Sequence, residues 1–161
     1  MSDTSTKTIE LRPLGRPEAE RIAGRKPAEQ DDWAEGFPRE DDCGPAIGLL
    51  GSADLGPFGV YLIVPLSHGR TVGTAGFYGP PDAYGQVTIG YGMVESEWGR
   101  GYGTGAVAGM LAVCRAHGGV AAVNADTDPD NVGSQRVLEK NGFALVRTTE
   151  TQRFYRLNLV S

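Results

Sequence analysis

The sequence predicts a single α/β domain whose mixed, mostly antiparallel sheet has about seven strands and about four helices. Between residues 60 and 94 the apolar residues recur with the period of two that is typical of strands, and the three strands of this stretch follow one another directly. After residue 104 the period changes to 3.6, and helices alternate with strands. A chain of 161 residues can bury one hydrophobic core, so we expect one domain over residues 1–161.

The N-terminal third contains one strand and two helical segments. Residues 8–14 (TIELRPL) alternate apolar and polar side chains, which predicts the first strand. Residues 17–23 (PEAERIA) carry proline and acidic side chains in the first turn, as helix starts do. Residues 29–59 are expected to form a helix–loop–helix region with a short helix at 45–50.

The middle of the chain is predicted to be a meander. Residues 60–66 and 71–78 form an antiparallel pair around turn residues at 67–70, and residues 86–94 form the next strand.

A helix over residues 104–117 opens the second half, because its apolar residues lie at i, i+3, i+4 and i+7: Val107, Met110, Leu111 and Cys114. The elements expected after it are a buried strand at 120–125, a helix at 131–140 with Asp130 or Asn131 as N-cap, and strands at 144–148 and 153–160. The predicted order is therefore β-α-α-β-β-β-α-β-α-β-β.

Composition and charge exclude several classes of function. The net charge of −5 leaves no overall basic field for nucleic acid or for an anionic membrane. Cys43 and Cys114 form no C-x-x-C pair and the only histidines are His68 and His117, so we expect reduced thiols and no metal site. The polar start of the chain and the short apolar runs predict a cytoplasmic protein.

The stretch EWGRGYGTG at residues 97–105 places glycine at every second position before a predicted helix. The first N–H groups of a helix are unpaired and lie at the positive end of its dipole, so they bind a phosphate or diphosphate where no Cβ blocks the approach. Arg100 adds a charge-assisted donor. The alternative is a flexible surface turn, but a strong strand precedes the stretch and a strong helix follows it.

Two other phosphate loops fit less well. A P-loop needs a lysine that this stretch lacks. The dinucleotide fingerprint G-x-G-x-x-G/A is matched by Gly101, Gly103 and Ala106, with Asp126 about 20 residues on. That fingerprint would have to open a doubly wound parallel sheet, whereas here it lies two-thirds along the chain and after a meander.

Two ordered motifs resemble those of the GNAT superfamily of acetyl-CoA-dependent N-acetyltransferases. The stretch IGYGMVESEWGRGYGTGA resembles the family's coenzyme A loop, and NVGSQRVLEKNGF at residues 131–143 resembles its N-x-x-S-x-x-V-L-x-K-x-G-F ending. Trp98 at the first position of the loop and Ser134 in the second motif are similar to the ribosomal-protein N-terminal acetyltransferases. The resemblance implies a sheet in which the strand before the loop and the strand after the helix splay apart to form an acetyl-CoA cleft.

The resemblance also implies roles for the cofactor-binding residues. The diphosphate would lie on the backbone of five consecutive residues, namely Arg100, Gly101, Tyr102, Gly103 and Thr104. The pantetheine arm would run along Met93 and Val94 like an added strand. The Met93 N–H falls where the family's oxyanion donor lies, and Asn131 matches the asparagine that bonds the arm. The alternative is that Asn131 only caps the helix.

Asp126 matches a position where related enzymes carry a glutamate base, and it is expected to act through a water. The alternative is that Asp126 and Asp128 only solvate a loop. The family's usual tyrosine acid is replaced by Leu138, so Ser134 becomes the candidate acid. Ser134 could instead only bond the backbone, with water or the departing ammonium protonating the thiolate.

The expected function is transfer of acetyl from acetyl-CoA to a primary amine at a protein or peptide N-terminus. The alternatives are a small-molecule amine acetyltransferase, for an antibiotic or a polyamine, and a non-catalytic acyl-CoA sensor. Acceptor contacts are expected from residues 31–59, including Trp33 and Phe37. The acidic side chains of that region either attract a cationic amine or solvate a loop: Asp31, Asp32, Glu35, Glu40, Asp41 and Asp42. A homodimer is implied only by the resemblance, because dimers are common among the ribosomal-protein N-terminal acetyltransferases.

Overall fold

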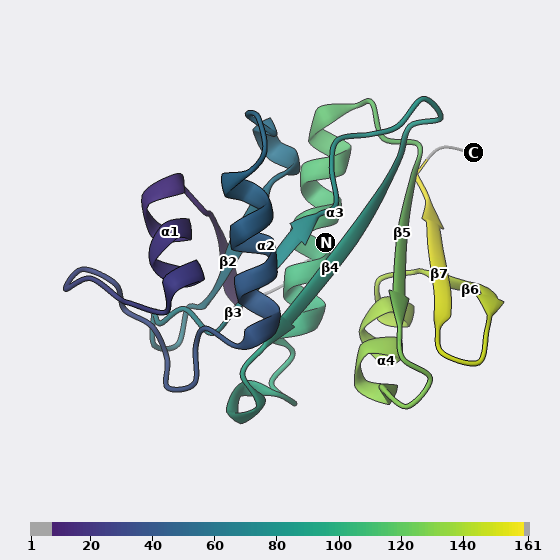
Figure 1. The fold of residues 1–161 in the computed structure, drawn as a ribbon. Helices are drawn as coiled ribbons and strands as arrows, with labels where there is room; N and C mark the ends of the chain where they lie inside the picture. The colour runs from purple at the N-terminus through teal and green to yellow at the C-terminus, as the bar shows by residue number, and fades with distance from the viewer. Residues whose placement is uncertain (1–7, 160–161) are drawn as a thin grey trace.

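The computed structural model describes residues 8–159 and contains one seven-stranded sheet with helices on both faces (Figure 1). The strands are β1 (Ile9–Pro13), β2 (Val60–Pro65), β3 (Gly73–Phe77), β4 (Gln86–Met93), β5 (Ala122–Thr127), β6 (Ala144–Thr148) and β7 (Arg153–Asn158). The helices are α1 (Arg16–Gly24), α2 (Glu40–Leu50), α3 (Tyr102–His117) and α4 (Val132–Lys140), with short 3-10 turns η1 (Gly56–Phe58) and η2 (Glu95–Glu97). The predicted α/β class and the predicted order of strands and α-helices are confirmed.

The sheet is antiparallel except at one place, between β4 and β5. The strand order is β1-β2-β3-β4-β5-β7-β6. The parallel pairing of β4 with β5 extends only over residues 86–88 and 122–124. Beyond that point β4 continues to Met93 and β5 to Thr127, and the two strands diverge toward their carboxyl ends (Figure 1). The sheet therefore opens in its middle, at the carboxyl end of a central strand.

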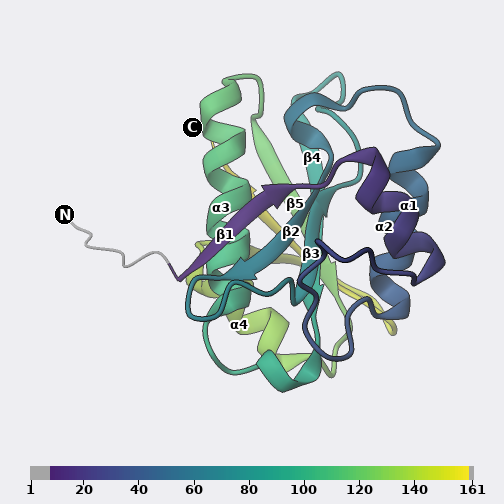
Figure 2. The same ribbon diagram turned by 90° about the vertical axis from the view of Figure 1, so that its left-hand side faces the viewer.

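The helices form two layers on opposite faces of the sheet. Figure 2 shows α3 and α4 on one side of the strands and α1 and α2 on the other. Helix α3 lies so close to β1 that a Cβ added at Gly109 would come within 2.6 Å of Leu11 Cδ1. Both layers bury aliphatic side chains against the sheet, and the fully buried ones include Ile22, Leu62, Ile63, Ile89, Val107, Met110 and Val123.

Helix α2 begins at Glu40, earlier than the predicted start at residue 45. The prediction assigned the residues up to Gly44 to a loop, because that stretch carries turn residues, and placed Pro45 as the first residue of the helix. At the helix start in the structure, Asp42 instead binds back to Arg39: Asp42 Oδ2 accepts the Arg39 N–H at 2.9 Å, and the Asp42 N–H donates to the Arg39 carbonyl at 3.0 Å. The starting residue of α2 is therefore determined by the hydrogen bonds of its first turn and by its packing, rather than by the helix propensity of the local sequence.

Two other boundaries differ from the prediction and both concern the site. Helix α3 begins at Tyr102 rather than at residue 104, so part of the glycine-rich stretch lies inside its first turn. Strand β5 spans Ala122–Thr127 rather than 120–125, so Asp126 lies within a strand, opposite Phe154 of β7, and not in a loop. Residue 160, the end of the last predicted strand, lies outside the described residues, as does most of the polar N-terminal segment.

Candidate active site

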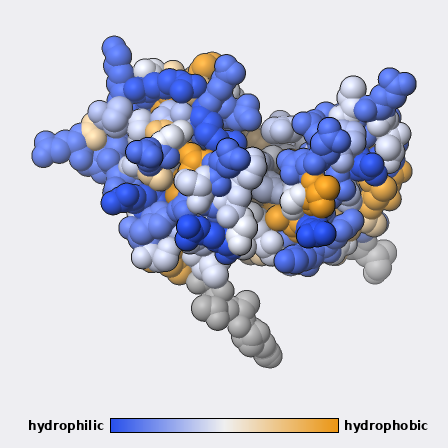
Figure 3. All heavy atoms as spheres, turned by 90° about the horizontal axis from the view of Figure 1, so that it is seen from below, coloured by the Kyte–Doolittle hydropathy of each residue, from blue (hydrophilic) through white to orange (hydrophobic). Residues whose placement is uncertain are grey.

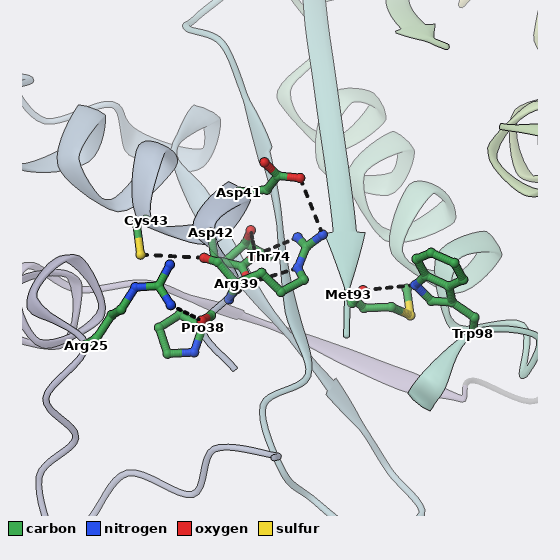
Figure 4. A network of polar contacts seen from close by, with 9 residues as sticks. All are labelled: Arg25, Pro38, Arg39, Asp41, Asp42, Cys43, Thr74, Met93 and Trp98. Carbon is green, nitrogen blue, oxygen red and sulfur yellow. Dashed lines mark hydrogen bonds and ion pairs between the residues drawn. The ribbon is translucent and has the colours of Figure 1, made fainter. Parts of the chain in front are cut away.

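The Met93 N–H points into the opening between β4 and β5. Val94 donates its N–H to the Val72 carbonyl of the neighbouring β3 segment at 2.9 Å. Backbone groups of successive strand residues point to opposite sides, so the N–H and carbonyl of Met93 face β5. The indole Nε1–H of Trp98 donates to the Met93 carbonyl at 2.9 Å (Figure 4). The strand thus presents a backbone N–H to the gap while a side chain already satisfies the carbonyl beside it.

The first turn of α3 lies beside this opening and has two open glycines before it. Gly99 (φ 78°) and Gly101 (φ 83°) adopt left-handed conformations, and a Cβ at either would meet no atom within 4 Å. Gly101 is the N-cap of α3, and no side chain caps the helix start. No side chain therefore occupies the N–H groups of the first turn, and their binding of an anion stays a prediction.

The other two glycines of the stretch serve packing. A Cβ at Gly103 would lie 3.3 Å from Tyr91 Cε2 and from Val137 Cγ2, and one at Gly105 would lie 3.1 Å from Ile9 Cγ1. These distances are tighter than ordinary contacts, so both glycines let α3 approach the sheet and α4. Gly103 and Gly105 therefore have a packing reason, and the interpretation that glycines clear space for a ligand stays a prediction for Gly99 and Gly101.

The side chains of Tyr102 and Arg100, both in the glycine-rich stretch, differ in exposure and so in what they can offer a ligand. Tyr102 is buried and its hydroxyl lies 3.1 Å from Ser67 Oγ, so only its backbone faces a ligand. Arg100 is exposed, and its Nε lies 3.3 Å from Glu97 Oε2. Glu97 is buried and also bonds His68. Arg100 therefore extends from a fixed carboxylate at the mouth of the loop, with guanidinium donors left for a phosphate.

A serine and a tyrosine meet at the start of α4. Asn131 is the N-cap of α4, as predicted, and its Oδ1 accepts the Ser134 N–H at 3.0 Å. The Ser134 Oγ lies 2.8 Å from the hydroxyl of Tyr91 on β4. Burial raises the pKa of Tyr91, and the hydrogen bond to Ser134 opposes that effect. Leu138 is a fully buried core residue on the same helix.

Asp126 lies on β5 and is exposed. The pKa of Tyr78 is raised, mainly because burial desolvates its hydroxyl and to a smaller extent because of the negative charge of Asp126. The Tyr78 hydroxyl lies over β4, since a Cβ added at Gly90 would come within 2.7 Å of it. The sequence analysis did not identify Tyr78 as a site residue, because an aromatic residue at the end of a strand carries no functional signal of its own.

A cavity of about 730 Å³ lies on the α1/α2 face of the sheet, where α2 crosses β3 and β4. Its floor is backbone because glycines occupy this face of the strands: Gly76, Gly90 and Gly92. Arg39 and Tyr78 are among its lining residues. In the view from below, a strip of residues of intermediate hydropathy separates the α1/α2 half of the molecule from the β5–β7 half (Figure 3).

The acidic side chains predicted to attract an amine have separate roles. Arg21 holds Asp31 through two hydrogen bonds at 2.6 and 2.8 Å, and this pairing keeps the pKa of Asp31 below its usual value. Asp42 is fully buried under Arg39. Trp33 and Phe37 pack edge to face, with ring centroids 5.5 Å apart. The segment therefore contains structural carboxylates and packed rings as well as exposed acids.

Among residues 8–159, no three of the His, Cys, Asp and Glu side chains are grouped in a way that would hold a metal ion. Within the same range, no helix is both long and apolar enough to cross a membrane.

The fold and this site define a class of protein: an α/β protein whose sheet opens beside an uncapped helix N-terminus that suits an anion. The model of the acetyltransferase (GNAT) domain matches residues 8–144. The chain belongs to the GNAT acetyltransferase family.

Individual relatives agree with this family. The uncharacterised N-acetyltransferase YjdG of Bacillus subtilis is 34% identical over 88 residues, which are 55% of this chain and 52% of that protein. The chain thus aligns with about half the length of this curated relative. Mycobacterium smegmatis RimJ in complex with CoA-disulfide has a similar fold, with a TM-score of 0.69 at 21% identity over 94% of this chain and 82% of that one.

A putative ribosomal-protein-serine acetyltransferase from Vibrio cholerae has a TM-score of 0.65 at 16% identity, over 96% of this chain and 95% of that one. The predicted resemblance to the family, with ribosomal-protein acetyltransferases among its structural neighbours, is confirmed.

Proposed function

We propose that this protein is an acetyl-CoA-dependent N-acetyltransferase whose acceptor is the α-amine of a peptide or protein. The observation that carries the proposal is the Met93 N–H, which faces the opening of the sheet beside the first turn of α3. Structural neighbours named as RimJ and RimL, in complexes with coenzyme A, support the donor and the acceptor class.

The chain's own groups fit the donor in two places. The N–H groups of Tyr102, Gly103 and Thr104 at the start of α3 suit a diphosphate, and Arg100 adds a cation beside them. The edge of β4 that ends at Met93 and Val94 offers backbone groups to an extended pantetheine arm, and Asn131 caps the helix that follows β5. Acetyl-CoA supplies the activated acetyl group.

Three groups serve the transfer step. The Met93 N–H stabilises the carbonyl oxygen as it becomes negative when the amine attacks. Asp126 removes one proton of the acceptor ammonium through a water, and the neutral amine then attacks the thioester carbonyl. Ser134, held by Tyr91, returns a proton to the departing thiolate. The acceptor ammonium loses two protons in all: the first goes to Asp126 before the attack, and the second leaves the nitrogen after it has bonded the acetyl carbon and restores the proton that Ser134 gives to the thiolate. The C–N bond forms as the C–S bond breaks.

The test of this function is thiol release from acetyl-CoA with a panel of acceptors: peptides with free N-termini, the same peptides with blocked N-termini, polyamines and aminoglycosides. We expect turnover with free peptide N-termini, and a rise in melting temperature with coenzyme A but not with NAD. Turnover confined to small amines would identify the other acceptor class. Stabilisation by coenzyme A without any thiol release would identify a sensor, and stabilisation by NAD alone would refute the donor.

Replacing Asp126 by asparagine is expected to lower kcat/KM for a peptide acceptor about 100-fold at pH 6.5 to 7. Below the α-amine pKa of about 8 the acceptor is mostly protonated, so loss of the base matters most there. As the pH rises above 8 the neutral amine forms in solution, and the deficit should shrink. The measurement is the pH profile of kcat/KM together with the Kd of coenzyme A, which should not change.

The matched control is Asp130→Asn, an exposed carboxylate shortly after Asp126. It should leave the profile unchanged. An Asp126→Asn variant whose pH profile matches that of the unsubstituted protein would remove Asp126 from the mechanism. The same profile measured on Ser134→Ala tests the proton donor, whose loss should lower kcat and not the affinity for coenzyme A.

A further inference from the structure

The cavity on the α1/α2 face reaches the backbone of β4 next to the candidate oxyanion donor. Gly90 and Gly92 have no side chains on this face, so the cavity extends to the strand itself. Gly92 directly precedes Met93, and the N–H of Met93 faces the opening of the sheet. An acceptor in this cavity therefore approaches the reacting carbonyl from the face opposite α3.

Arg39 is a rigid group in the wall of this cavity (Figure 4). Its Nε donates to Asp42 Oδ2 at 3.0 Å and its Nη2 donates to Asp42 Oδ1 at 2.8 Å. Asp42 is fully buried and also accepts the Thr74 hydroxyl at 2.6 Å. A bidentate bond to a fixed carboxylate holds the guanidinium plane in one orientation. Arg39 is therefore preorganised before any acceptor binds.

The guanidinium lies over Gly92. A Cβ added at Gly92 would come within 2.6 Å of Arg39 Nη2 and 2.7 Å of Nη1. Consecutive Cα atoms are about 3.8 Å apart, so the guanidinium lies roughly one residue from the Met93 N–H. An alanine at position 92 would displace Arg39, which explains a glycine inside a strand here.

Nη1 is the free end of this group. Its only charged neighbour among the described residues is Asp41 Oδ2 at 3.9 Å, a carboxylate that is 86% exposed and so interacts weakly. Asp42 neutralises the guanidinium and Asp41 adds a negative charge, so the surroundings favour a neutral oxygen over a second anion. An amide carbonyl oxygen is such a group.

We propose that Arg39 binds the first carbonyl oxygen of the acceptor and thereby selects α-aminoacyl amines, that is, peptide N-termini. In such an acceptor the amine nitrogen and that oxygen are about 3 Å apart, which follows from standard bond lengths. This spacing places the amine at the opening when the oxygen reaches Nη1. A polyamine or a lysine side-chain amine has no carbonyl at that distance. The inference rests on the proposed function and specifies which group of the acceptor its site recognises.

The test compares a tripeptide amide with its thioamide twin, that is, the analogue in which sulfur replaces the first carbonyl oxygen. A thiocarbonyl sulfur is a weak acceptor of nearly the same shape. We expect the twin to have about tenfold lower kcat/KM, mostly through KM, because a hydrogen bond to a charged group contributes that much. In the double variant Arg39→Met/Asp42→Asn, which leaves no buried charge unpaired, the two peptides should react equally.

Arg70→Met is the matched control, because Arg70 is an exposed arginine outside the cavity, and it should keep the tenfold ratio. A ratio near one in the unsubstituted protein would overturn the inference even if the double variant fails to fold. A double variant that folds and retains the tenfold ratio would also overturn it. If peptides are acetylated but the oxygen and sulfur forms react equally, only the role of Arg39 is refuted. If no peptide is acetylated, the proposed acceptor is refuted and the inference with it.

Discussion

Replacing Gly73 by alanine is expected to destabilise the protein by at least about 3 kcal/mol and to abolish coenzyme A binding in any folded fraction. Gly73 lies on β3 opposite Met93, and an added Cβ would stand 2.0 Å from the Gly92 carbonyl oxygen and 2.7 Å from Met93 Cα. These are backbone atoms, so no rotamer change relieves the overlap. Strand β4 would have to move at the residue whose N–H faces the opening.

Urea unfolding and titration with coenzyme A measure the two effects. Gly24→Ala is the control, because a Cβ at Gly24 would meet nothing within 4 Å, and it should change the free energy of unfolding by less than about 0.5 kcal/mol. A Gly73→Ala protein with unchanged unfolding and unchanged affinity would mean that β3 and β4 are not this close.

Replacing Asp42 by alanine is expected to lower the free energy of unfolding by about 3 kcal/mol. The substitution leaves Arg39 without its counter-charge and Thr74 without its acceptor, and it removes the carboxylate that accepts the Arg39 N–H at the start of α2. Any folded fraction should also bind peptide acceptors more weakly, because Arg39 loses its fixed orientation. The free energy of unfolding and the KM of a peptide acceptor are the quantities to measure.

Asp41→Ala provides the comparison for Asp42. Asp41 lies one residue earlier in the same turn but is exposed, so the expected loss is within about 0.5 kcal/mol. Asp42→Asn retains an oxygen for Thr74 and should therefore cost less than Asp42→Ala. Equal stabilities for Asp41→Ala and Asp42→Ala would show that the buried network does not support the fold.

Local patterns predicted the features that depend on neighbours in the chain. Asp130 or Asn131 was expected to cap α4 because both residue types favour the N-cap, and the structure has Asn131, which accepts the Ser134 N–H. The prediction failed for the start of α2, because the residues up to Gly44 carry the composition of a turn although the helix begins at Glu40. Buried hydrogen bonds from Asp42 to other segments outweigh that propensity, and no local window of sequence contains them.

The sequence by itself determined the order of elements, the glycine-rich turn before α3 and the family that these motifs resemble, because each depends on residues close together in the chain. Only the tertiary structure decided which groups meet. Tyr91 and Ser134 are 43 residues apart and hydrogen-bonded, and Arg39 lies over Gly92. The direction of the Met93 N–H follows from the register of β3 against β4. Register and packing are set by contacts between distant segments, so the chemistry of the site emerges only when the sheet is assembled.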